Sequence, residues 1–104
     1  MKGDLLMKHL KSRPQELKGL KPTLIKKAKD YAYSRIEFYV KDNSLYIKMT
    51  GRGKKAKWFV LENYKNHTAL EVISECAGWG RHFEDGILEL WQLNDLKFGW
   101  IVGE

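Results

Sequence analysis

The sequence contains few of the residues and runs that mark several large classes of protein. It has one cysteine, two prolines and nine glycines in 104 residues. One cysteine excludes an internal disulfide and a zinc site built from several thiolates. The low proline and glycine content excludes a collagen-like or low-complexity chain. The longest fully apolar run, residues 58–61, is far too short to cross a membrane.

The residues that are present favour one small domain spanning residues 1–104. Hydrophobic residues make up 43% of the chain, too many for a fully disordered protein. The length suits a single hydrophobic core. Charged residues interrupt the first 13 positions, which therefore lack the apolar centre of a signal peptide. These features predict an intracellular, cytoplasmic protein with no membrane segment.

The formal net charge of +6 conceals opposite charges along the chain. Residues 1–35 carry ten Lys/Arg and three Asp/Glu, residues 36–66 carry seven and three, and residues 67–104 carry two and seven. Basic surface attracts polyanions through long-range attraction and counterion release. The first two segments therefore predict a nucleic acid as the partner. The alternative is that lysine-rich surfaces only keep a small domain soluble.

Residues 1–35 are predicted to be a basic helical segment. Ser12 and Gln15 have the spacing of a helix cap, and Pro14 fits a first helical turn. Gly19 ends this short helix. From Pro22 onward, apolar residues recur with helical spacing. The lysines off that apolar arc form a basic outer face: Lys26, Lys27 and Lys29.

Residues 36–66 are predicted to be a basic β-sheet segment. Apolar residues alternate with others over 36–41 and 45–50, on either side of the turn signal 42–44. This period predicts a β-hairpin. Residues 57–62 are the expected third strand, although a helical period also fits residues 56–62.

Residues 67–104 are predicted to be an acidic helix followed by a β-hairpin. Thr68 and Glu71 form a capping box, and Gly78 ends the helix. Cys76 falls on its apolar arc, which predicts an inert buried thiol. Residues 87–93 and 98–102 are the expected strands of the hairpin. The predicted order is thus α-α-β-β-β-α-β-β, an α+β fold with a mainly antiparallel five-stranded sheet and a helix packed on one face.

The first candidate site is the basic turn between the second and third predicted strands. Its cations are Arg52, Lys54, Lys55 and Lys57. Arginine would make forked contacts to phosphates, and the lysines would act as point charges. The alternative is a solvated turn whose charges prevent edge-to-edge pairing.

The second candidate site is the face of the hairpin opposite the core. Tyr39 and Tyr46 would point outward there, beside Lys41 and Lys48. Aromatic rings between lysines on an open sheet can stack unpaired bases. The alternative is that the N-terminal helices cover this face and that the tyrosines form a second layer of core.

The preferred function is therefore a non-catalytic nucleic-acid-binding domain, for DNA or RNA, without cofactor or metal. The alternative is a small protein-binding module or inhibitor, of the kind that viruses and mobile elements encode to modulate a host enzyme. Tryptophan and arginine anchor many interfaces, and the residues expected in that case are Trp79, Arg81, Trp91 and Trp100. The opposite charges of the two parts would also support a homodimer.

A hydrolase or nuclease is the least favoured class. His82, Glu84 and Asp85 lie close together in the sequence, and His67 precedes the helix. Histidine with a carboxylate to orient it can act as a general base. This spacing is generic, however, and no phosphate-binding glycine loop accompanies it.

Overall fold

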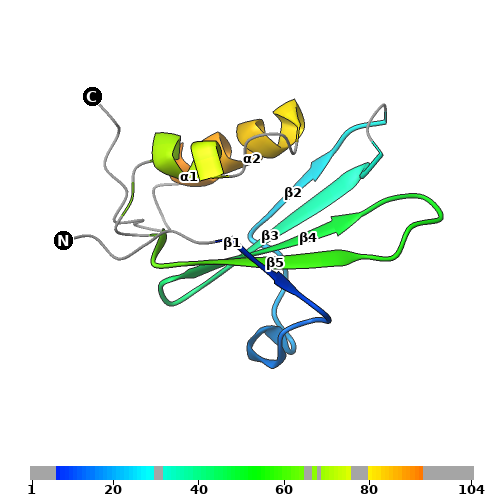
Figure 1. The fold of residues 1–104 in the computed structure, drawn as a ribbon, viewed down its shortest axis with the longest axis horizontal. Helices are drawn as coiled ribbons and strands as arrows, with labels where there is room; N and C mark the ends of the chain where they lie inside the picture. Colours follow the sequence, from blue (N-terminus) through cyan, green and yellow to red (C-terminus); the bar gives the residue numbers. More distant parts are fainter. Residues whose placement is uncertain (1–6, 30–31, 65–66, 68, 76–79, 93–104) are drawn as a thin grey trace.

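The computed structural model describes residues 7–29, 32–64, 67, 69–75 and 80–92. Within these ranges the chain forms five β-strands, one turn of 3-10 helix and two α-helices (Figure 1). The elements are β1 (Met7–Leu10), η1 (Gln15–Leu17), β2 (Leu24–Lys27), β3 (Arg35–Lys41), β4 (Ser44–Thr50), β5 (Lys57–Glu62), α1 (Ala69–Glu75) and α2 (Arg81–Gln92).

All strands belong to one antiparallel sheet in the order β1-β5-β4-β3-β2. Strands β3, β4 and β5 follow one another as a meander in the middle. Because β1 and β2 form opposite edges, the connection between them, residues 11–23, must cross the sheet. It does so on the face opposite the α-helices and carries η1 (Figure 1).

The main hydrophobic core lies between the sheet and the two α-helices. Strand alternation directs every second side chain of β3, β4 and β5 toward the helices. Phe83, Ile87 and Leu90 of α2 complete this layer and are fully buried. At Gly86, a Cβ atom would lie 2.6 Å from two ring carbons of Phe38, so glycine permits the close packing of α2 on the sheet.

A second, smaller core lies on the opposite face of the sheet. Its buried members are Leu17, Tyr39, Tyr46, Trp58 and Val60. Leu17 comes from η1 and has no exposed surface. The long connection between the two edge strands is therefore a packed layer that covers the sheet.

The structure corrects the predicted fold class and element order, because the protein is mostly sheet and both α-helices follow the strands. The described part of residues 1–35 forms two strands and a 3-10 turn, not two helices. Strand β1 pairs with the distant β5, whereas β2 pairs with β3, the next strand along the chain. Backbone hydrogen bonds available at the sheet edges therefore override the local helical spacing of 24–32.

The predicted strand at residues 87–93 is also wrong, because α2 extends through Gln92. The spacing of four and then three residues between Phe83, Ile87 and Leu90 places all three on one buried helical face. The predicted strand at 98–102 lies outside the described residues.

Local patterns in the middle of the chain are confirmed. The predicted hairpin corresponds to β3 and β4, and the predicted third strand matches β5 from Lys57 to Glu62. The helical alternative for 56–62 is wrong. Helix α1 begins at Ala69, directly after the proposed capping residue Thr68. Thr68 and Cys76 both lie outside the described residues.

No helix in the described part of the chain is long and apolar enough to cross a membrane.

Candidate nucleic-acid interface

Two loops that are far apart in the sequence leave the sheet at the same end. Strand β3 pairs with both β2 and β4, and Arg35 aligns with Lys27 on one side and Thr50 on the other. The β2–β3 connection and the β4–β5 connection therefore leave the sheet at the same end, as Figure 1 shows. We call these connections, residues 28–34 and 51–56, the two tips.

The two tips are in direct contact. The backbone of Gly51 approaches Ala32 so closely that a Cβ atom on it would overlap the carbonyl oxygen of Ala32. The ammonium nitrogens of Lys54 and Lys57 lie 5.6 and 5.2 Å from the centroid of the Tyr33 ring, within the range of a cation–π contact. One tip thus supplies an aromatic support for cations of the other.

The tips and the strand residues beside them gather seven cations. This cation cluster consists of Lys27, Lys29, Arg35, Arg52, Lys54, Lys55 and Lys57. Four of them, Lys27, Lys29, Arg52 and Lys55, are exposed and form no ion pair within the described ranges. The one acidic residue between 27 and 35 or 51 and 57, Asp30, lies outside the described residues. Within the described residues, these four cations therefore carry positive charge that no ion pair neutralises.

A hollow of about 430 Å³ opens at the β2–β3 tip. It is lined by Lys27, Ala28, Lys29, Ser34 and Arg35. The Arg35 Nε atom donates a hydrogen bond of 3.2 Å to Glu37 Oε2, which holds its side chain over the sheet. The exposed wall of the hollow is mostly apolar, so the hollow itself is not a phosphate site, although three cations lie around it.

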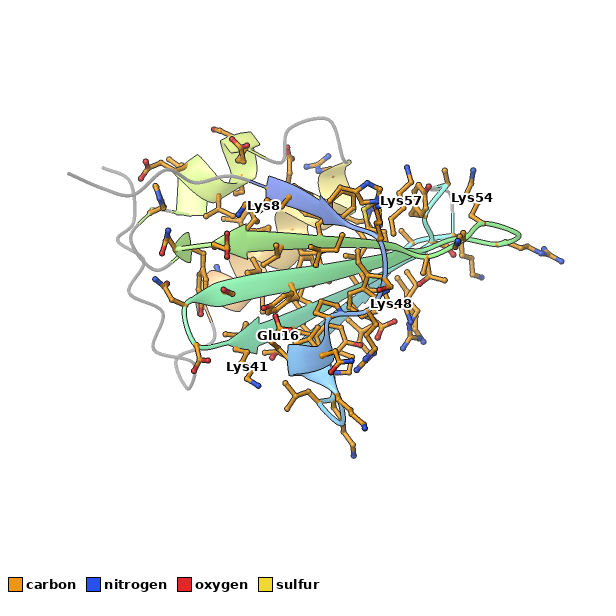
Figure 2. The ribbon with its side chains drawn as sticks, turned by 60° about the horizontal axis from the view of Figure 1, so that its bottom comes forward. Lys8, Glu16, Lys41, Lys48, Lys54 and Lys57 are labelled. Carbon is orange, nitrogen blue, oxygen red and sulfur yellow. The ribbon has the colours of Figure 1, made fainter. Side chains whose placement is uncertain are left out.

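The structure separates three of the predicted lysines from this cluster. Lys26 faces α2 and forms an ion pair with Glu89, so it is not on the outer face of a helix. Lys41 lies toward the opposite end of the sheet (Figure 2), where its Nζ atom donates to the carbonyl oxygen of Glu16 at 2.9 Å. Lys48 lies in mid-sheet, with Nζ 5.4 Å from the centroid of a Trp58 ring.

The predicted stacking platform is closed in this structure. Tyr39 and Tyr46 retain 3% and 7% of their surface, because the connection with Leu17 covers them. The Tyr39 hydroxyl donates to Glu37 Oε1 at 2.8 Å, and the Tyr46 hydroxyl donates to Glu16 Oε2 at 3.0 Å. The expectation of an open face is thus corrected: the N-terminal segment does cover the tyrosines, although as a 3-10 turn and not as helices.

Arg13 links the connection to the aromatic residues that the connection covers. Its guanidinium carbon lies 5.4 Å from the Tyr39 ring centroid and 5.3 Å from that of Trp58. Its Nη2 atom also donates to the Leu17 carbonyl oxygen at 3.0 Å. The arginine therefore joins the connection to the aromatic residues beneath it.

Buried tyrosines make the stability of this protein sensitive to alkaline pH. Burial and hydrogen bonds to carboxylates raise the pKa of Tyr39 and Tyr46 above the ordinary value of 10.0, and burial raises the pKa of Tyr64. The folded state therefore favours the neutral phenol, and this contribution is complete below pH 10 and lost as pH rises above it. We expect urea denaturation at successive pH values to show the free energy of unfolding falling above about pH 10.

Phenylalanine variants provide the control for this pH dependence. Phenylalanine does not ionise, so the double variant Tyr39→Phe/Tyr46→Phe should lose less stability than the wild type as the pH rises through the phenol range, from about 9.5 to about 11.5. Equal losses in both proteins would assign the alkaline effect to other groups.

The two described histidines of the acidic segment make buried structural contacts. The His82 Nε2 atom lies 3.2 Å from the Tyr33 carbonyl oxygen and connects α2 to the β2–β3 tip. His67 Nδ1 lies 3.4 Å from Glu71 Oε2. Glu84 and Asp85 lie on α2. Among the described residues, no group of three or more His, Cys, Asp or Glu side chains could hold a metal ion.

Of the four residues proposed for a protein interface, the structure describes the side chain of only one. Arg81 is exposed at the start of α2. Trp79 and Trp100 lie outside the described residues, and so does the side chain of Trp91. The described chain therefore provides one of the four proposed anchors.

The sequence pattern missed Arg35 and the role of Tyr33 in this interface. Both lie in the β2–β3 hairpin, which was predicted as the end of a helix. This hairpin could have been recognised from the short stretch 28–34, because it lies between two runs that contain β-branched residues, Leu24–Lys27 and Arg35–Lys41.

Comparisons of the chain with protein-family models, with curated proteins and with solved structures give no match. The structure defines a five-stranded antiparallel sheet with α-helices on one face, a packed connection on the other and a cation cluster at one end.

Proposed function

We propose that this protein is a non-catalytic nucleic-acid-binding domain that contacts phosphates through the cation cluster. One observation carries this proposal: the fold brings cations from two hairpins to one end of the sheet, and four of these cations are exposed and unpaired among the described residues. Neutralising several phosphates releases counterions and supplies most of the affinity for a polyanion. The single cysteine supports a cytoplasmic location, where thiols stay reduced.

Removing two tip charges should weaken binding strongly. We expect Arg52→Gln/Lys55→Gln to lower affinity for a labelled oligonucleotide at least tenfold at about 50 mM salt, measured by fluorescence anisotropy. The slope of log K against log salt should shrink by about 0.9 for each duplex phosphate that the protein no longer neutralises. Both positions are exposed, so the free energy of unfolding should change by less than about 0.5 kcal/mol.

The matched control removes the same charge elsewhere. Lys18 and Lys21 are exposed in the connection that crosses the sheet, away from the two tips. Lys18→Gln/Lys21→Gln should retain most of the affinity and the salt slope. Equal weakening in both variants would show that net charge, and not the cation cluster, governs binding. A wild-type protein that retains neither DNA nor RNA at about 50 mM salt would refute the proposed function.

A further inference from the structure

The described aromatic rings offer little surface for stacking bases. Tyr39, Tyr46 and Trp58 lie beneath the connection with 3%, 7% and 5% of their surface exposed. On the helix side, the ring of Phe59 is stacked by His9 at a centroid distance of 5.1 Å. Tyr33, at the tips, is half-buried and carries two lysines against its ring. Since base stacking on open rings is a main source of affinity for single strands, the described surface is poorly suited to them.

The cations of the β4–β5 tip, in contrast, lie on a projecting ribbon. The β4–β5 tip extends past the end of the sheet (Figures 1 and 2) and carries exposed Arg52 and Lys55. A two-stranded β-ribbon fits the major groove of B-form DNA, which is about 12 Å wide. The major groove of A-form RNA is deep and too narrow for side chains to enter. The shape of this tip therefore favours B-form DNA over duplex RNA.

The neighbouring tip is placed to contact the wall of such a groove. Its hollow is lined by three cations, Lys27, Lys29 and Arg35. The contact between Gly51 and Ala32 and the contacts of Lys54 and Lys57 with the Tyr33 ring place the two tips side by side. A ribbon in the groove and the exposed Lys27 and Lys29 beside it would contact one duplex at two places.

We infer that the ligand is double-stranded DNA, with the β4–β5 tip in the major groove and the β2–β3 tip against the adjoining phosphates. This inference rests on the proposed function and adds the form of the nucleic acid. Phosphate contacts dominate this arrangement, so affinity should depend weakly on sequence.

The test compares three labelled probes of one sequence by fluorescence anisotropy: a DNA duplex of about 20 base pairs, one of its single strands and the corresponding RNA duplex. At about 50 mM salt we expect the DNA duplex to bind at least tenfold more tightly than either other probe. If the single strand or the RNA duplex binds as tightly, the inference is wrong while the proposed function stands. If no probe binds, the proposed function fails as well.

Modified duplexes test the groove assignment. Bulky groups at C5 of cytosine fill the major groove, whereas groups at N2 of guanine fill the minor groove. The first modification should weaken binding of the wild-type protein at least tenfold, and the second should leave it nearly unchanged. Equal effects of the two modifications, or weakening only with the second, would overturn the placement of the tip in the major groove.

Discussion

Replacing Leu17 with alanine is expected to lower the free energy of unfolding by about 2–5 kcal/mol, the usual cost of emptying a fully buried leucine site. Leu17 has no exposed surface and packs among Tyr39, Tyr46, Trp58 and Val60. The Tyr46 hydroxyl donates to Glu16 Oε2 of the same turn at 3.0 Å, which restrains the turn from collapsing into the cavity. Urea denaturation followed by circular dichroism measures the change.

Leu20→Ala is the matched control for this substitution. Leu20 lies three residues further along the same connection but is 41% exposed, so its truncation should cost less than about 0.5 kcal/mol. If Leu17→Ala is as stable as Leu20→Ala, the connection does not hold the second face of the sheet. Affinity for DNA should be unchanged in both variants under folding conditions, because neither residue belongs to the cation cluster.

The central hairpin could be predicted because the residues that specify it, the alternating side chains and the turn, are close together in the sequence. Strands β3 and β4 pair across the short turn at 42–43, and their alternating side chains specify both faces. Asp42 adopts a positive φ of 53° there, which is tolerated by aspartate in turns. The basic tip that follows was likewise visible as a run of charges, and the structure leaves Arg52 and Lys55 exposed.

The N-terminal strands could not be predicted in the same way. Each has four residues, too few to establish a two-residue period. The partner of β1 lies far along the chain, as the ion pair between Lys8 and Glu62 illustrates, whereas β2 pairs with the next strand, β3. The predicted cap at Ser12 is wrong, because Pro14 occupies the N-cap position and no side chain caps the turn. The helical turn covers only Gln15–Leu17, and Gly19 follows with a φ of 80°.

Helix α2 was missed because of a glycine at its centre. Gly86 directly precedes the predicted strand at 87–93, and a glycine at such a position is typical of a break between elements. In the structure it lies inside α2 and lets the helix pack against Phe38. Missing the β2–β3 hairpin had a larger effect on the site. Without β2, one tip could be predicted but not its neighbour, and the cation cluster depends on both.

Gly51→Ala is expected to lower the free energy of unfolding by about 1–3 kcal/mol, the typical cost of overpacking a tight contact. The added Cβ atom would overlap the carbonyl oxygen of Ala32 and approach Lys54 Cδ to 3.0 Å. The lysine can rotate away, but a backbone oxygen held between β2 and β3 can move only with its hairpin tip. The two tips would therefore separate, and affinity for DNA should fall severalfold even at temperatures where the variant remains folded.

Gly53→Asn separates this effect from a general disturbance of the same loop. Gly53 has a φ of 68° and open space around it, and asparagine tolerates this left-handed conformation better than other side chains. The control should therefore keep both stability and DNA affinity close to wild type, measured by urea denaturation and fluorescence anisotropy on the same samples. If Gly51→Ala binds DNA as tightly as Gly53→Asn, the spacing of the two tips does not matter for binding. A single flexible tip would then account for binding, since affinity that survives separation of the tips cannot depend on two fixed points of contact.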